Sequence, residues 1–156
     1  MEPITLNIIK KFILYTILLF SLGSIAQESI PNSTEMCNTL TKMIENDRMY
    51  RGKEILTDGK YGRERKYSQK VIDSVWKLQW KLDNANTEKL IELTKKYGWM
   101  TDERINCPEL NIWLIFRHSQ KKYFKEISEL IEKEHKAKRL TDFFYKQIND
   151  HIIGKY

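Results

Sequence analysis

The residues best suited to acid–base chemistry are one histidine and three charged side chains that lie far apart in the sequence. His118 ends the densest apolar run after the N-terminal segment, residues 110–118. Imidazole changes its charge near neutral pH, so His118 is a candidate general base or metal ligand. The alternative is a histidine that only satisfies a backbone carbonyl or a carboxylate at a helix end.

Asp47 and Arg51 continue the apolar stripe of the first expected helix and lie four positions apart, so both should face inward and pair. As a functional pair, Asp47 would orient the imidazole of His118. As a structural pair, the two side chains would form a buried ion pair that fixes helix register. Asp150, near the C-terminus, is the fourth candidate. The sequence leaves open whether the four residues meet in one cleft.

Other kinds of active site lack their usual patterns. The histidines, His118, His135 and His151, show no HxxxH, HxH or HExxH spacing, so no metal ion is predicted. No serine lies in a GxSxG turn and no glycine-rich phosphate loop is present, so no cofactor is expected either. The tryptophans occupy core-like positions, and a sugar-binding platform would require them to be exposed: Trp76, Trp80, Trp99 and Trp113.

The N-terminal 26 residues have the pattern of a cleavable secretory signal. Lys10 and Lys11 precede an apolar run, and small residues at 24 and 26 suit a cleavage site. The run of about 15 residues is shorter than the roughly 20 that a spanning helix needs, although an uncleaved anchor is the alternative. We expect a secreted or periplasmic protein with no stable membrane span after cleavage.

Cys37 and Cys107 form an even pair, and in an oxidising compartment such a pair favours a disulfide over two free buried thiols. The whole chain carries 27 basic and 21 acidic residues, a net charge of +6, and removal of the signal lowers the charge to +5. Basic and acidic residues are mixed, which permits weak attraction to anionic surfaces but argues against nucleic acid as a partner.

The positioning elements are predicted to be helices, because no segment alternates strictly with period two. We expect one all-α domain over residues 34–153, with about six helices around a central apolar helix at about 108–118. Residues 27–33 form a short leader, and residues 52–66, rich in glycine, lysine and arginine, form a basic loop. Asn32 should cap the first helix and Thr141 the last.

The second expected helix, from about residue 68, carries an inward stripe of Val71, Val75, Leu78 and Leu82. Residues 83–86, Asp-Asn-Ala-Asn, have turn chemistry and should end this helix before a third one begins. Gly98 should stop that third helix, with Trp99 folding back onto it.

Several short motifs, taken in order, resemble the DUF6624 family of uncharacterised, mostly bacterial proteins. They are the segments at residues 47–51, 83–86, 98–99, 113–118 and 150–151, and the resemblance covers about residues 39–153. The family has no established activity, cofactor or catalytic residue, so it implies none here. The residues favour a binding module for an unknown protein or small-molecule ligand. The alternative is a hydrolase-like enzyme that uses His118 with Asp47 and Arg51 in a cleft.

Overall fold

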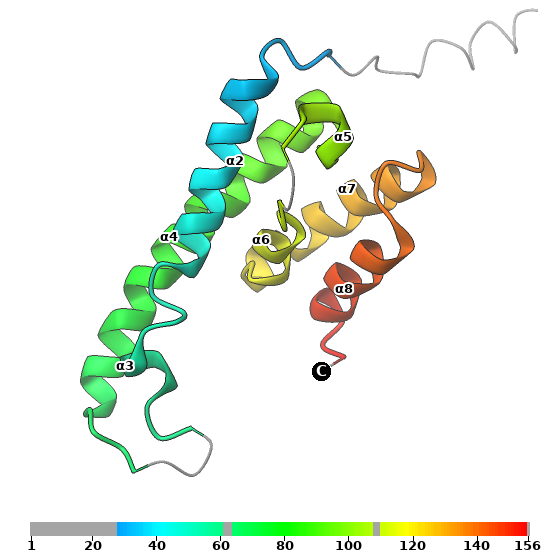
Figure 1. Ribbon diagram of the computed structural model, residues 1–156. Helices are drawn as coiled ribbons and strands as arrows, with labels where there is room; N and C mark the ends of the chain where they lie inside the picture. The colour runs from blue at the N-terminus through cyan, green and yellow to red at the C-terminus, as the bar shows by residue number, and fades with distance from the viewer. Residues whose placement is uncertain (1–27, 61–63, 108–109, 156) are drawn as a thin grey trace, which may run out of the picture.

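Two long antiparallel helices, α2 (Ser33–Arg48) and α4 (Gln69–Tyr97), lie side by side and frame the structure (Figure 1). The computed structural model describes residues 28–60, 64–107 and 110–155. Within these ranges every regular element is helical, which confirms the all-α prediction. The predicted signal at residues 1–26 lies outside them. No helix in these ranges is both long and apolar enough to cross a membrane.

Helix α2 begins as the sequence predicts, because the side chain of Asn32 accepts a hydrogen bond from the backbone N–H of Glu35 at 3.1 Å. Its inward stripe runs through buried Leu40 and Met43 and ends on Asp47, which is 2 % exposed. A charged residue therefore occupies the last inward position of the helix, where a lone charge would be costly unless it were paired.

Helix α4 is one helix of 29 residues, so the predicted turn at residues 83–86 is wrong. Asp and Asn disfavour helix interiors mainly because their side chains compete for nearby backbone groups. Here tertiary partners occupy those side chains instead. Asp83 binds Arg51, and Asn86 donates to the carbonyl of Met43 at 2.8 Å. The helix consequently continues through them to Gly98, whose positive φ of 76° ends it as predicted.

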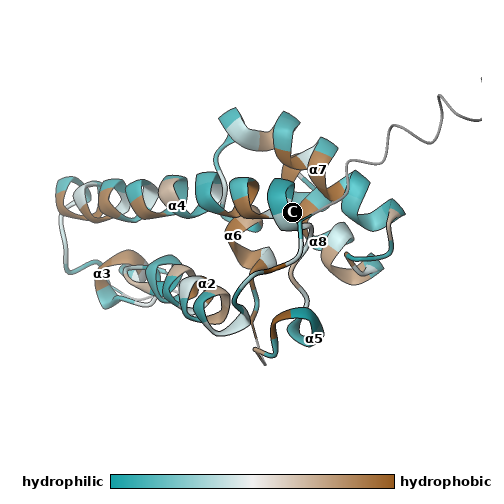
Figure 2. Ribbon diagram, turned by 90° about the horizontal axis from the view of Figure 1, so that it is seen from above, coloured by the Kyte–Doolittle hydropathy of each residue, from teal (hydrophilic) through white to brown (hydrophobic). Residues whose placement is uncertain are grey.

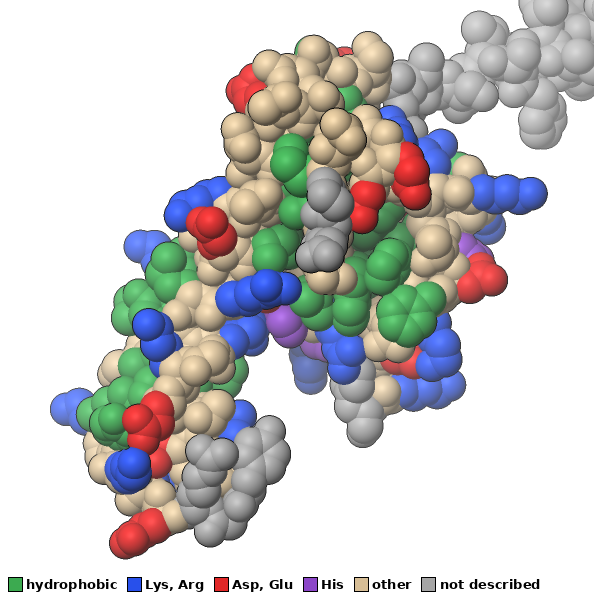
Figure 3. Space-filling model, in the orientation of Figure 1, with side chains coloured by type: hydrophobic (Ala, Val, Ile, Leu, Met, Phe, Trp, Pro, Cys, Tyr) green, Lys and Arg blue, Asp and Glu red, His purple; other side chains and the backbone are tan. Residues whose placement is uncertain are grey.

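The inward face of the outer half of α4 also differs from the prediction. Val71 and Leu78 are 41 % and 49 % exposed, whereas Ile72 and Gln79 are buried. This outer half, residues 69–82, forms with residues 49–60 an arm that extends away from the C-terminal helices (Figure 1). Figure 3 shows hydrophobic surface (green) along the outer edge of this arm.

The predicted basic loop at residues 52–66 is partly structured. It contains a short helix, α3 (Glu54–Thr57), whose Leu56 packs inward with 3 % exposure. The carboxylate of Asp58 then accepts hydrogen bonds from the backbone N–H groups of Lys66 and Tyr67 at 3.0 and 2.8 Å. These bonds close the segment against the start of α4.

The central helix is shorter than predicted. Helix α6 spans only Trp113–Arg117; residue 110 lies outside any helix, and Pro108 lies outside the described residues. The preceding helix, α5 (Asp102–Ile105), ends at Asn106 in the left-handed conformation. The central position itself is confirmed, because Ile115 and Phe116 are 1 % and 0 % exposed.

The C-terminal helices close the domain around α6. A single 3-10 turn, η1 (Lys121–Tyr123), leads into α7 (Phe124–Lys136), and α8 (Asp142–Ile152) follows with Thr141 as its N-cap, as predicted. Seen from above, α6 lies among α2, α4, α7 and α8, with the brown hydrophobic faces turned inward (Figure 2).

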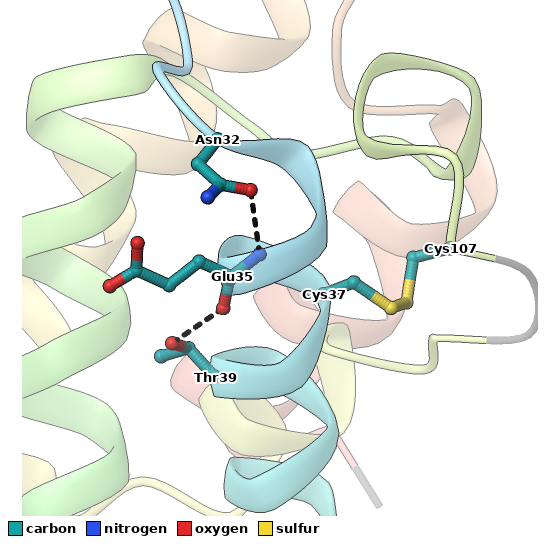
Figure 4. The surroundings of a disulfide bond; sticks show 5 residues. All are labelled: Asn32, Glu35, Cys37, Thr39 and Cys107. Atoms are coloured by element: carbon teal, nitrogen blue, oxygen red, sulfur yellow. Dashed lines mark hydrogen bonds between the residues drawn. A yellow bond between two sulfur atoms is a disulfide. The ribbon is translucent and has the colours of Figure 1, made fainter.

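A disulfide joins Cys37 of α2 to Cys107, just after α5, with Cα atoms 5.5 Å apart (Figure 4). The two cysteines are 70 positions apart in the sequence. The bond confirms the predicted pairing and fastens the segment that leads to α6 onto the first half of α2.

Candidate functional site

The central contact of the site joins Asp47 to His118. Nδ1 of His118 lies 2.7 Å from Oδ1 of Asp47, and the Asp47 side chain is only 3 % exposed. A carboxylate at this distance fixes the tautomer in which Nδ1 carries the proton. Nε2 then keeps its lone pair, and no described residue hydrogen-bonds to it. The His118 side chain is 26 % exposed, so this nitrogen is not sealed in the core.

The two side chains meet because each ends an element that is anchored in the core. Asp47 lies one turn beyond buried Met43 on the same face of α2. His118 is the C-cap of α6, where its N–H donates to the carbonyl of Leu114 at 2.9 Å. Burial of Phe116 holds that helix end in place.

Arg51 bridges two buried carboxylates. Its Nη2 donates to Oδ2 of Asp83 at 2.6 Å, while its Nε lies 3.6 Å from Oδ1 of Asp47. The predicted Asp47–Arg51 pair therefore exists, but the shorter contact of Arg51 is with Asp83. Because both carboxylates are almost fully buried, the guanidinium offsets charge that would otherwise be costly in the interior.

Gln79 is a further member of the site that the sequence analysis did not identify. Its Nε2 donates to Oδ1 of Asp83 at 2.8 Å and to the carbonyl of Asp47 at 3.1 Å. Its Oε1 accepts from the N–H of Tyr50 at 2.9 Å. Gln79 thereby fastens the end of α2 to α4. Its i, i+4 spacing to Asp83 and the motif at 83–86 were the only sequence signals for this pair.

Burial raises the pKa of Asp83 above its ordinary value of 3.8. The hydrogen bond from Gln79 and the positive charge of Arg51 act in the opposite direction, and the nearby carboxylate of Asp47 adds to the rise. Desolvation is the largest of these effects because the charged form loses water that the protein replaces only in part.

Asp150 does not join the other three candidates. Its carboxylate pairs with Lys146 one turn earlier on α8. The next residue, His151, contacts the residue that follows His118: its Nε2 lies 3.0 Å from the carbonyl oxygen of Ser119. The remaining histidine, His135, lies outside the cluster, and its Nε2 is 2.7 Å from Oδ1 of Asp142. Among the described residues no group of three His, Cys, Asp or Glu side chains is arranged to hold a metal ion.

The site lies where the arm meets the C-terminal helices. Figure 3 shows histidine surface (purple) beside Lys and Arg side chains (blue) in the hollow between these two parts. A separate cavity of about 190 Å³ lies between α5, α6 and α8. Trp99, Trp113 and Phe144 contribute its apolar lining, and none of the four candidate residues lines it.

No protein-family model matches the chain, and no curated protein or solved structure is detectably similar to it.

Proposed function

We propose that this domain is a hydrolase-like enzyme in which His118, oriented by Asp47, is the general base. The observation that carries the proposal is the 2.7 Å contact between a buried carboxylate and Nδ1 of a partly exposed imidazole. In this tautomer Nε2 is the basic nitrogen and is free of described hydrogen-bond partners. Such an arrangement is the orienting half of an acid–base catalytic site.

The chemistry follows from the two nitrogens. Nε2 of His118 takes a proton from a water molecule as the water oxygen attacks an electrophilic carbon or phosphorus. The imidazolium that forms is stabilised by the carboxylate of Asp47. Nε2 then returns the proton to the leaving oxygen, so the histidine ends in its starting state. Ser119 is not the nucleophile, because its hydroxyl is buried and donates to the carbonyl of Phe116 at 2.6 Å.

The test is a screen against p-nitrophenyl esters, phosphodiesters and glycosides, comparing the wild type with His118→Gln. His135→Gln is a matched control, since His135 also contacts an aspartate at 2.7 Å but lies outside the cluster. Loss of general-base catalysis should lower the rate by about 10²- to 10⁴-fold in the first variant only. Equal rates for both variants would contradict the proposal, as would an imidazole of His118 protonated at Nε2 in ¹⁵N NMR spectra.

The second candidate is a binding module for a small-molecule ligand. The cavity between α5, α6 and α8 favours it, because apolar and aromatic side chains line it together with Asn111, Arg139 and Thr141. Fragment screening by NMR distinguishes the two functions. A ligand that shifts the indole signal of Trp113, and still binds after His118→Gln, would support the binding module.

We also propose that the chain is exported and cleaved after Ala26. The Cys37–Cys107 disulfide supports an oxidising compartment. Mass spectrometry of the secreted protein should give an N-terminus at Gln27 and two cysteines that resist alkylation.

Membership in the DUF6624 family is likewise a proposal. It is supported by the fact that residues from three separate motifs, Asp47 with Arg51, Asp83, and His118, make up one cluster. An alignment of exported relatives in which these residues vary independently would contradict it.

A further inference from the structure

A stacked pair of tryptophans extends the site along α4. Trp76, Trp80 and Asp83 are spaced i, i+4, i+7 and therefore share one face of the helix. The two indole rings stack with centroids 6.2 Å apart and planes 26° from parallel. Asp83 belongs to the cluster described above, so this face leads directly from the stacked rings to the buried carboxylates.

Arg51 connects the stack to the acid–base pair. Its guanidinium carbon lies 5.9 Å from the ring centre of Trp76, and its Nε lies 3.6 Å from Oδ1 of Asp47, which in turn contacts His118. Nη2 is used by Asp83, but no described residue accepts a hydrogen bond from Nη1. With the side chain 22 % exposed, Arg51 retains a charged donor beside the aromatic rings.

The stacked tryptophans are not fully buried in the core. Trp80 is 46 % exposed, in contrast to Trp99, which is 3 % exposed and packs against Phe116 in the core. Tryptophan is enriched at binding interfaces, where its ring has an apolar body and a polar neighbour. A sugar-binding platform requires exposed indoles. Trp80 is exposed and Trp76 is partly exposed, whereas Trp99 is buried.

We propose that Trp76 and Trp80 form a platform that binds pyranose rings of an oligosaccharide. The C–H face of such a ring is apolar and stacks on indole, while its rim of hydroxyl groups accepts hydrogen bonds from a donor such as Nη1 of Arg51. A single-stranded nucleic acid also stacks on aromatic rings, but it requires a groove of clustered cations. Beside the rings on this helix, Lys77 and Lys81 are basic, but the exposed residue one turn before Lys77, Asp73, is acidic.

The burial of the two carboxylates indicates which bond of the sugar substrate would be hydrolysed. This part of the inference rests on the proposed function. Glycoside hydrolysis needs two carboxyl groups that flank the substrate. Asp47 and Asp83 are each 2 % exposed and cannot contact one. An O-acyl substituent on the sugar fits better. Water activated by Nε2 of His118 adds to the acyl carbon, the carbon–oxygen ester bond breaks, and the proton passes to the sugar oxygen, giving a carboxylic acid and a free hydroxyl.

The binding test uses calorimetry with cellohexaose, chitohexaose and acetylated xylohexaose as probes. Trp80→Ala should weaken binding by about tenfold or more, because the sugar would lose one of the two indole rings on which it stacks. Leu78→Ala is the matched control, because Leu78 is on the same helix and is 49 % exposed. Circular dichroism checks that both variants are folded.

The outcomes separate the platform from the catalytic proposal. Binding that survives His118→Gln but weakens in Trp80→Ala supports the platform, whether or not acetate is released. Release of acetate that is unaffected by His118→Gln contradicts the proposed function alone. The platform is overturned if none of the three probes binds, if both α4 variants bind equally, or if a thymidine hexanucleotide binds more tightly than the sugars.

Discussion

Nδ1 of His118 lies 2.7 Å from Oδ1 of Asp47, and this contact joins the end of α6 to the last turn of α2 across 71 positions of the sequence. Neither element reaches the other through local structure. The contact depends on the core that packs beneath both elements. Measurements of rate and of unfolding free energy can therefore be compared for the same variants.

Replacement of Asp47 by Asn should abolish the orientation of His118 while preserving the shape of the side chain. The amide cannot favour the Nδ1-protonated tautomer or stabilise an imidazolium. We expect the rate of hydrolysis to fall by about 10²- to 10⁴-fold and the free energy of unfolding to fall by about 1–3 kcal/mol. Kinetics and urea unfolding check the two effects. A rate equal to that of the wild type would contradict the assigned role of Asp47.

Replacement of Gln79 by Leu should destabilise the protein although it inserts an apolar residue into a buried site. The change leaves the N–H of Tyr50 and Oδ1 of Asp83 without their partner, and an unsatisfied buried group costs about 1–3 kcal/mol. Gln69→Leu is the control, because Gln69 is exposed on the same helix and bonds Asp73. Its effect should stay within about 0.5 kcal/mol. Equal unfolding midpoints for both variants would contradict the bridging role.

Asp83 should make the protein less stable as the pH rises. Burial raises its pKa in the folded state, so the folded protein holds the proton more tightly than the unfolded chain does. The free energy of unfolding contributed by this group therefore falls from about pH 4 upward, until the pH passes the folded-state pKa. Asp83→Asn should remove this component. Chemical unfolding of both proteins between pH 4 and 7 measures it, and a wild type that gains stability relative to the variant over this range would reverse the sign.

Loss of the disulfide should lower stability by about 4 kcal/mol, the chain-entropy value for a loop of this size. The Cys37→Ala/Cys107→Ala double variant and the wild type in reducing agent should unfold at similar temperatures, both below the oxidised wild type. If reducing agent leaves the melting temperature of the wild type unchanged, the bond makes no contribution in solution.

Helical periodicity predicts the fold class. The same periodicity indicates the candidates Asp47, Arg51 and His118, which the structure brings together. Asp47 continues the apolar stripe of α2, and His118 follows a helix whose Ile115 and Phe116 are almost fully buried. Periodicity therefore indicates which side chains lie at the ends of core-facing elements. It does not indicate distance between elements, and Asp150, also near the end of a helix, pairs locally with Lys146 instead.

The errors in α4 have a physical cause as well. The prediction assumed that apolar residues mark the inside and that Asp and Asn mark a turn. In this helix Gln79, Asp83 and Asn86 all face inward, and each finds a hydrogen-bond partner on α2 or in the segment just after it. Only tertiary contacts make such positions favourable, and a pattern within one helix does not contain them.

The disulfide has a consequence for the order in which the site assembles. Cys37 and Asp47 lie on the same helix, α2, and Cys107 and His118 lie eleven positions apart in the sequence. The disulfide joins the two cysteines, and the hydrogen bond joins Asp47 to His118. Oxidation of the cysteines shortens the search of the His118 segment for its partner on α2. A reduced chain would lack this tether, so the contact between Asp47 and His118 should form more slowly before the cysteines are oxidised.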